Sequence, residues 1–502
     1  MMFTTTPARS RTALSVVTRD LIANYMVCLL KGIIACSKSA GKENARYYLI
    51  DPDAGPAISE FKSLLVFKPA EYIVSEDDCE TVHTADISDG TGALELIAAD
   101  VEKMIAKGSN SKTYKGGVSE IDAVTDRMWS ALSRSGKLLL KKLAYAAPII
   151  IRFHNDADGS GGAYGLYASL RDLSGRSGWL NYRHNITWIM NPSVSYGAYE
   201  ASSDIMIANN YECVEKPLLI IIDFGTSLES NPGIELVKDR FDVIWLDHHP
   251  TVEGFKGLDL ENYINPWNFG GDSNYTAGLL ACTFSKTFSR RDTRDIENAS
   301  LIGDYSNFSR PGDEGTDISM ILDLLTSDMR IAFGSATDNL TPYEIDKVIS
   351  DSAKRKELAD FAKMRLDEVM DIALGSLKRY NAEKATIYVL DFEGIRDEQS
   401  KFPLPGRFSS KLLDRIIWMG NGPAIVVVHS GRYVSMRVPR DLEDKVDLIK
   451  VVGSVKESHE ELIEAGGGHR TASGIKIADA AEKPKVLKEI ISLLKAQLAG
   501  SA

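Results

Sequence analysis

IIIRFHNDADG, residues 149–159, is an apolar run that ends in a histidine and two aspartates. Side chains alternate along an extended strand, so His154, Asp156 and Asp158 are expected to leave the strand end on one side. Acidic groups this close together repel one another, and their pKa values rise unless a cation or an arginine neutralises them. A short Asp-x-Asp-Gly motif is also an ordinary polar turn. The stretch therefore indicates a metal site only if other ligand types gather beside it.

From residue 147 onward, apolar runs alternate with helix-like stretches. The apolar runs fall at 148–153, 186–190, 218–223 and 243–247, and helical patterns lie between the first two runs and again at 275–288. Short, continuously apolar strands that alternate with helices predict a parallel sheet covered on both faces. In such sheets, ligands collect at the carboxyl ends of the strands.

Candidate metal ligands stand at the ends of further runs. One run ends in Asp223 and the next in Asp247, His248 and His249. A lone aspartate is often a turn residue or a helix cap, but buried imidazoles need hydrogen-bond partners and are hard to explain by packing. Asp304 follows a helical run and a glycine, which also suits a simple helix end. Carboxylates with one or two imidazoles favour Mn²⁺ or Mg²⁺ over structural Zn²⁺.

Composition limits the kinds of partner. The chain has 502 residues, a formal net charge of −12 and a 44% hydrophobic content, which fits about two to four globular domains. The acidic balance disfavours a broad grip on long duplex nucleic acid, whereas a few local arginines and lysines are enough for short anionic ligands. The five cysteines form no Cys-x-x-Cys pair, so a reducing cytoplasm is expected. The apolar segment 21–36 contains Lys31 and predicts a buried helix, with no membrane anchor.

Taken together, these motifs resemble those of the DHH phosphoesterase superfamily. The resemblance rests on HNDADG at 154–159, Asp223, Asp247-His248-His249 and Gly303-Asp304, and the form of the first motif is similar to the RecJ-like branch. GGGHRTASG at 466–474 resembles the signature of the companion substrate-binding domain, DHHA1. The resemblance covers roughly 147–491 and depends on five ordered motifs.

The fold class that this implies is α/β with several domains. We expect an N-terminal α+β extension of unknown role at 1–145, a parallel-sheet DHH catalytic domain with flanking helices at 146–340, a helical connector at 341–383 and a smaller α/β DHHA1 domain at 384–502. A long helical connector is predicted over 342–380. In the last domain, strands are expected at 386–392, 424–429 and 433–438, and helices at 442–455 and 485–498. Residues 121–143 predict an amphipathic helix, as do residues 93–107.

The resemblance also implies a role for each site residue. Two ions of Mn²⁺ or Mg²⁺ would be held by His154, Asp156, Asp158, Asp223, His248 and Asp304, with Asp223 bridging them. His154 and Asp156 would complete one site, and Asp158, His248 and Asp304 the other. His249 would polarise the scissile phosphate or protonate the leaving oxygen, and Asp247 would orient a neighbouring imidazole. Asp338 is a rival fourth ligand, although its place before the connector suits a helix start.

The glycine run 466–468 is predicted to bind an anion. Glycines let the backbone approach a phosphate closely, and neighbouring histidine and arginine side chains can donate to its oxygens. The expected substrate-binding residues are Gly467, Gly468, His469, Arg470, Arg437 and, as the weakest candidate, Arg407. Three glycines can also form nothing more than a tight turn.

The resemblance implies a metal-dependent phosphodiesterase with nucleotide-containing substrates. The leading expectation is a RecJ-like exonuclease or oligonucleotide phosphodiesterase that releases nucleoside monophosphates from single strands. One alternative is a cyclic-dinucleotide or dinucleotide phosphodiesterase. A replication-associated scaffold is another, but it predicts missing carboxylates, whereas all the expected positions are filled here. The first 145 residues are expected to bind nucleic acid, a partner or another subunit. For the chain as a whole, a homodimer or a replication or repair partner is expected.

Overall fold

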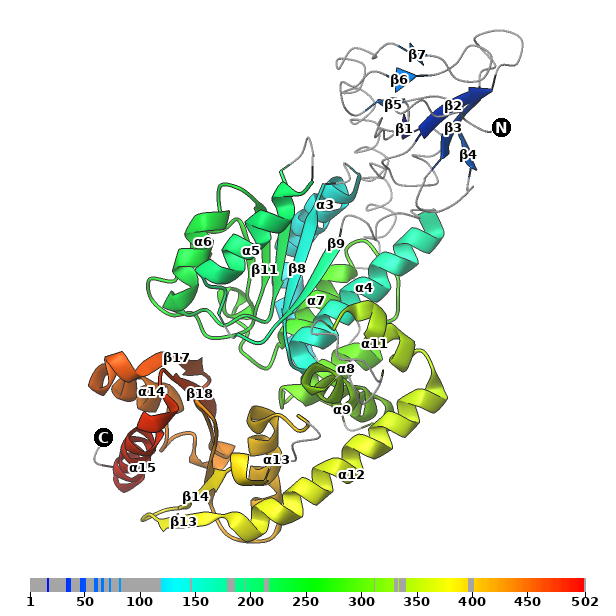
Figure 1. Ribbon diagram of the computed structural model, residues 1–502. Coiled ribbons are helices and arrows are strands. Elements are labelled where there is room, and N and C mark those ends of the chain that lie inside the picture. Colours follow the sequence, from blue (N-terminus) through cyan, green and yellow to red (C-terminus); the bar gives the residue numbers. More distant parts are fainter. Residues whose placement is uncertain are drawn as a thin grey trace.

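The computed structural model describes residues 119–144, 147–177, 186–193, 195–211, 216–310, 312–328, 333, 340–395 and 401–500 (Figure 1). In the first 118 residues it describes short strands. Among all described residues, no helix is both long enough and apolar enough to cross a membrane.

A five-stranded parallel sheet forms the centre of the first lobe, and the predicted parallel sheet is confirmed. Its order is β12-β11-β10-β8-β9. The strands are β8 (Ile149–His154), β9 (Ile186–Asn191), β10 (Leu218–Ile222), β11 (Asp242–Leu246) and the short edge strand β12 (Asn262–Ile264), which the sequence analysis did not anticipate.

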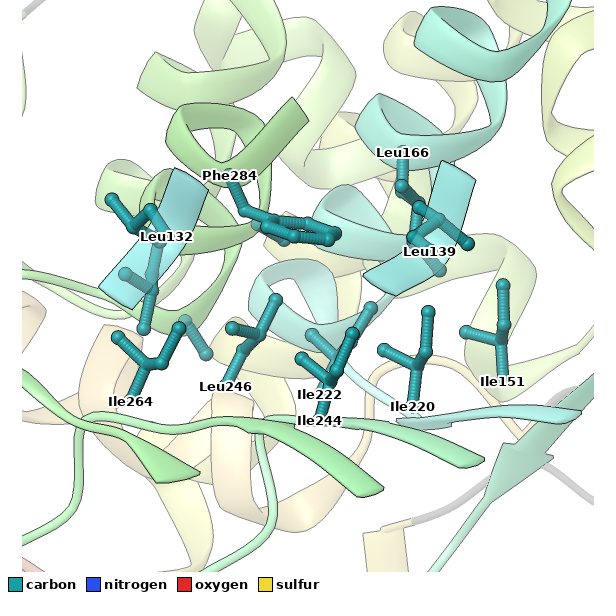
Figure 2. Close-up of a cluster of buried hydrophobic side chains, with 14 of the residues drawn as sticks. Leu132, Leu139, Ile151, Leu166, Ile220, Ile222, Ile244, Leu246, Ile264 and Phe284 are labelled. Atoms are coloured by element: carbon teal, nitrogen blue, oxygen red, sulfur yellow. The ribbon is translucent and has the colours of Figure 1, made fainter. Parts of the chain in front are cut away.

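Both faces of this sheet are buried, because successive side chains of each strand enter different cores. Ile151 lies in a core with side chains of α3 (Ser119–Ala144), α4 (Ala157–Ser177) and α7 (Ala277–Ser285). Figure 2 shows Ile151, Ile220 and Ile244 pointing from the strands toward these helices. Ile150 enters the opposite core with α5 (Ala198–Asn209) and α6 (Asn231–Val237). Each fully buried isoleucine contributes about 1.5–3 kcal/mol of transfer free energy.

A layer of helices extends the first lobe and leads to the second. α8 (Arg294–Gly303) and α9 (Asp313–Ser327) share a core with α4, α11 (Pro342–Ile349) and the first half of α12 (Ser352–Ser376). The helical connector predicted over 342–380 is present as two consecutive helices, α11 and α12, and is wrong only at its end. Asp351 accepts hydrogen bonds from the N–H groups of Ala353 and Lys354, so it caps a new helix and divides the segment. The end of the segment forms β13 (Lys378–Asn381), because it pairs with a neighbouring strand.

The second lobe is a six-stranded mixed sheet in the order β13-β14-β15-β16-β18-β17. The predicted strands are confirmed as β14 (Thr386–Asp391), β15 (Ala424–Ser430) and β16 (Tyr433–Arg437). α13 (Pro405–Trp418) covers one face, and α14 (Leu448–Ser458) and α15 (Lys483–Ala499) cover the other. The sequence analysis missed α13 and the hairpin of β17 (Ile463–Gly468) and β18 (Ala472–Ile477).

The N-terminal region contains strands where the sequence analysis expected part of a helix. β2 (Ile33–Ser37), β3 (Arg46–Ile50) and β4 (Ile58–Phe61) form an antiparallel sheet. The predicted helix over 21–36 is therefore wrong at its end, where β-branched isoleucines pair with β3. The remaining described strands there are β1 (Val16–Val17), β5 (Leu65–Val66), β6 (Tyr72–Ile73) and β7 (Thr81–Val82). Residues 93–107 and Asp338 lie outside the described residues, whereas α3 confirms the helix predicted over 121–143.

Candidate metal centre

The candidate ligands meet at the carboxyl edge of the parallel sheet. His154 is the last residue of β8, and Asp156 follows in a bend. Asp158 lies in the first turn of α4, so the extended geometry expected beyond His154 is wrong. The chain doubles back there, and a Cβ on Gly159 would lie 2.6 Å from the His154 carbonyl oxygen. The carboxylate of Asp158 accepts hydrogen bonds of 2.8 and 2.9 Å from the N–H groups of Ala277 and Gly278, at the start of α7.

The six predicted ligands form two groups of three. Asp223 belongs to the first group and lies beside the second. In each group, His154-Asp156-Asp223 and Asp158-His248-Asp304, the ligand atoms all lie within 4.8 Å of one another. Asp223 Oδ2 is 3.5 Å from Nδ1 of His154, and Asp223 Oδ1 is 3.4 Å from Nε2 of His248. That His248 nitrogen is also 3.6 Å from Oδ2 of Asp304. One carboxylate therefore presents one oxygen to each group, as a bridging ligand must.

Two residues of the centre have strained backbones. Asp223 has φ 62° and Tyr305, directly after Asp304, has φ 54°; among the described residues these are the non-glycine residues with positive φ. The left-handed region costs roughly 1–2 kcal/mol for a residue with a Cβ. The Asp223 N–H still donates to the Leu246 carbonyl at 3.0 Å, so β11 helps to hold the strained residue. Strain that persists only at such a cluster is typical of functional sites.

The charges of the centre require positive partners. Burial, followed by the nearby charge of Asp223, raises the pKa of Asp158 well above its usual value. Burial would also raise the pKa of Asp223, but hydrogen bonds with His154 and His248 outweigh it and hold that pKa well below its usual value. Burial alone would lower the pKa of His154, yet Asp156 and Asp223 raise it to about 10. Buried carboxylates and imidazoles in this arrangement fit hard divalent cations, which would replace the protons.

Two residues that the sequence analysis missed orient His248. Its Nδ1 lies 2.8 Å from the Ser273 carbonyl oxygen, so this nitrogen carries the proton and Nε2 faces the carboxylates. The Ser273 hydroxyl donates to the His248 carbonyl at 2.8 Å, and the indole N–H of Trp267 donates to the same carbonyl at 3.1 Å. Trp267 follows β12 at the same edge of the sheet. No motif marked either residue, and only the recognition of β12 would have drawn attention to them.

The predicted catalytic pair is placed beside a histidine of the second lobe. Nδ1 of His249 lies 2.9 Å from Oδ1 of Asp247. The His249 ring stacks on the ring of His469, with centres 4.7 Å apart and planes at 12°. Burial, with the charges of His249 and His248, holds the pKa of His469 well below its usual value. Among the described residues, the buried Nδ1 of His469 has no hydrogen-bond partner, so it is a polar atom that a ligand can satisfy.

Arg407, the weakest candidate from the sequence, has the closest contact to the ligands. Its Nη2 is 3.2 Å from Oδ2 of Asp156, and Nη1 is 3.9 Å from Oδ1 of Asp304. Asp323 of α9, which the sequence analysis missed, lies 3.3 Å from Nε of Arg407. Burial raises the pKa of Asp323 to about 6, although Arg407 opposes this effect. Without a bound cation, Arg407 supplies part of the positive charge that the carboxylates require.

The other predicted substrate-binding residues, Arg437, Arg470, Gly467 and Gly468, have contacts outside the group of ligand candidates. Arg437 donates to Ser410 Oγ at 2.7 Å and to the Gly406 carbonyl at 2.8 Å, so its contacts support the start of α13. Arg470 is half exposed and lies 3.2 Å from Asp447. Gly467 and Gly468 belong to β17, at the edge of the second sheet, and are not merely a tight turn. A Cβ on Gly467 would meet nothing within 4 Å, whereas Gly468 has φ 134° and would place its Cβ 2.4 Å from the Ala472 carbonyl oxygen.

The first lobe is a doubly wound parallel sheet, with acidic and imidazole side chains at its carboxyl edge. It therefore belongs to the class of α/β proteins that bind ligands at this edge of the sheet. Residues 148–301 match the family model described as DHH family, N-terminal domain. This part of the chain is therefore similar to the N-terminal domain of the DHH family.

The similarity to known proteins extends beyond residues 148–301. "Uncharacterized protein MJ1198" of Methanocaldococcus jannaschii is 23% identical over 429 residues, which cover 74% of this chain and 54% of the relative. The chain thus spans about half the length of this curated relative. A solved structure described as "Member of s1p family of ribosomal proteins PF0399 DHH domain" has a TM-score of 0.65 and 18% identity, over 81% of this chain and 99% of that chain, and shows a shared fold. RecJ of Thermus thermophilus in complex with Mn²⁺ has a TM-score of 0.46 and 14% identity, over 72% of this chain and 54% of RecJ.

Proposed function

We propose that the protein is a metal-dependent phosphodiesterase that hydrolyses single-stranded nucleic acid or short oligonucleotides to nucleoside monophosphates. The observation that carries this proposal is the convergence of the six ligand candidates into two groups of three. Asp223 is a member of one group and lies 3.4 Å from His248 of the other. The match of residues 148–301 to the model of the DHH family N-terminal domain supports it. The proposed cofactor is a pair of Mn²⁺ or Mg²⁺ ions, which would supply an activated water and neutralise the phosphate charge.

The protein groups around the proposed ions have complementary tasks. His154 and Asp156 would hold one ion. Asp158, His248 and Asp304 would hold the other, and Asp223 would contact both ions. Asp247 holds His249 through Nδ1, which leaves Nε2 of His249 to donate a proton to the leaving oxygen. Asp247 is fully buried, whereas the His249 side chain is 23% exposed, so a leaving oxygen can approach it.

The second lobe is the proposed binding surface for the nucleotide. Nδ1 of His469 is buried without a partner among the described residues, and its ring lies against His249. Arg407 lies within 3.9 Å of two ligand candidates and can donate to a phosphate oxygen that approaches them. Gly467 leaves open space at the edge of β17, where a backbone can approach an anion. These features support the assignment of residues 384–502 as the substrate-binding domain and 146–340 as the catalytic one.

The rival function with most support is hydrolysis of cyclic or linear dinucleotides. The net charge of −12 favours short substrates over long ones, because long strands bind largely through basic surfaces. A scaffold role without catalysis is disfavoured, since every expected ligand position is filled and all six ligands converge. For residues 1–145 we propose a role in binding nucleic acid, a replication or repair partner, or a second copy of the chain.

The test uses the purified full chain with Mn²⁺ or Mg²⁺. Substrates are 5′- and 3′-end-labelled DNA and RNA strands of graded length, cyclic dinucleotides and pyrophosphate. Progressive release of nucleoside monophosphates from long single strands is the expected result. Cleavage confined to cyclic dinucleotides and the shortest strands would favour the rival function. Absence of phosphodiester cleavage with either metal would overturn the proposal.

A further inference from the structure

The carbonyl groups on either side of Asp304 accept hydrogen bonds from the second lobe. Arg407 donates from Nη1 to the Gly303 carbonyl oxygen. Arg440, in the short turn η8 (Arg440–Leu442), donates from Nη2 to the Tyr305 carbonyl oxygen at 2.9 Å. A ligand candidate of the first lobe is thus bracketed by two arginines that belong to the other lobe.

One face of α13 contacts the same turn. Arg407, Lys411 and Asp414 are spaced by four and three residues, so they lie on one side of the helix. The Lys411 ammonium lies 5.1 Å from the centre of the Tyr305 ring, within the range of a cation–π interaction. Burial, followed by the nearby charge of Asp414, raises the pKa of the Tyr305 hydroxyl. Arg407 and Lys411 of this face therefore contact the Gly303–Tyr305 turn.

The turn needs such support because its backbone is strained. α8 ends at Gly303, and Tyr305 has φ 54° at a position where helices usually place glycine. A Cβ on Gly303 would lie 2.7 Å from Cβ of Ala157, so the end of α8 is also pressed against α4. Within the first lobe, the Ser306 hydroxyl donates to the Asn274 carbonyl at 2.6 Å. Strained residues persist only where several neighbours fix them, and here most of those side-chain contacts come from the second lobe.

We propose that Lys411 and Arg440 are positioning residues for Asp304, and that docking of the second lobe completes the cation site formed by Asp158, His248 and Asp304. This inference rests on the proposed function, because it requires that the site binds a divalent cation. Coupling between two equilibria is reciprocal. Docking of the second lobe therefore strengthens cation binding at this site, and the bound cation strengthens the docking. The group formed by His154, Asp156 and Asp223 has no member in this turn.

The test is a Mn²⁺ titration of the full chain by calorimetry, with the Lys411→Ala/Arg440→Ala double variant. We expect affinity for one Mn²⁺ to fall roughly 10-fold, as is typical when residues behind a metal ligand are removed, and affinity for the other to stay the same. Arg440→Lys keeps a donor and should show a smaller loss. Arg415→Ala is the matched control: it removes a cation from the same helix, but Arg415 lies 3.3 Å from Asp367 on α12.

A second measurement does not depend on how well the double variant folds. In the wild-type chain, Mn²⁺ should slow amide hydrogen exchange in α13, and this effect should disappear in Asp304→Asn. The inference would be overturned if the double variant bound Mn²⁺ with wild-type affinity. It would also be overturned if Mn²⁺ bound to the wild-type chain without changing the rate of amide hydrogen exchange in α13. Either result would leave the proposed function standing. Failure of the wild-type chain to bind either Mn²⁺ or Mg²⁺ would overturn the proposed function itself.

Discussion

Asp223 is the residue on which the metal hypothesis depends most. Its oxygens face His154 and His248 separately, at 3.5 and 3.4 Å. Asp223→Asn keeps the shape but removes the charge shared by both cations, so we expect loss of paired Mn²⁺ binding and a decrease in phosphodiesterase activity of roughly 10²–10³-fold. Calorimetry and initial rates measure the two effects. Asp292→Asn, which changes a surface aspartate paired with Arg294, is the control and should leave both unchanged.

Trp267 tests how strongly the orientation of His248 matters. Trp267→Phe removes the indole N–H that donates to the His248 carbonyl but retains an aromatic ring. We expect Mn²⁺ affinity to fall roughly 10-fold, as for other residues that orient a ligand, with little change in the free energy of unfolding. The control is Trp418→Phe, because Trp418 is 77% exposed and lies at the end of α13. Equal Mn²⁺ affinities for both variants and the wild type would contradict the orienting role.

The charge state of His154 predicts a pH dependence. In the metal-free chain its pKa is raised to about 10 by Asp156 and Asp223 despite burial. The unfolded value is about 6.5. A raised pKa stabilises the fold fully below the unfolded value, and this contribution is lost between roughly pH 6.5 and 10. Because Mn²⁺ requires the neutral imidazole, its binding at pH 7.5 should release protons, which calorimetry in buffers of different ionisation enthalpy detects. A heat of binding that is independent of the buffer would contradict this prediction.

At the scale of elements, the turn from β8 to α4 fixes the site most tightly. A Cβ on Gly159 would lie 2.6 Å from the carbonyl oxygen of His154, which is backbone and cannot move aside. We expect Gly159→Ala to lower the free energy of unfolding by about 1–3 kcal/mol and to weaken Mn²⁺ binding as well. Gly375→Ala is the matched control, because that position in α12 has open space and alanine favours a helix. Urea denaturation distinguishes the two, and an unchanged midpoint for Gly159→Ala would contradict the close approach.

The sequence predicted elements well where side-chain periodicity dominates. The apolar runs that became β8, β9, β10 and β11 were visible because buried parallel strands are continuously apolar. β17 was missed because its glycines carry no apolar pattern, and only pairing with β18 makes it a strand. β13 was assigned to a helix for a related reason, since pairing with β14 outweighs local propensity. The apolar pattern of one strand does not show that it will pair, even when its partner follows it directly in the chain.

At the scale of the whole molecule, the site is formed by residues of two lobes. This explains which site residues could be predicted from the sequence and which could not. The ligand candidates stand in short motifs at strand and helix ends, so their chemistry was readable one by one. Arg407 was ranked lowest because no motif surrounds it, yet it contacts Asp156 and Asp323 across the lobes. Asp323 was missed for the same reason. Contacts between lobes depend on how the helices of the connector set the lobes against each other, which no local pattern shows.

An ion pair away from the metal centre tests whether the lobes must stay together for activity. Lys456 of α14 lies 2.6 Å from Glu229 of the first lobe, and both side chains are about one third exposed, at 35% and 31%. Lys456→Glu places two like charges there, so we expect the lobes to separate more easily. Exposed pairs contribute about 0.2–1 kcal/mol, so KM for a short oligonucleotide should rise roughly twofold to fivefold at low salt while kcat stays the same.

The reversed pair provides the control. Glu229→Lys combined with Lys456→Glu restores opposite charges and should return KM toward the wild-type value. Added salt should reduce the difference between the single variant and the wild type, because the Debye length shortens from about 30 Å at 0.01 M to about 8 Å at 0.15 M. A single variant that matches the wild type at low salt would show that this contact does not hold the lobes together. The contacts of α13 and Arg440 with the Gly303–Tyr305 turn would then have to hold the second lobe on the first.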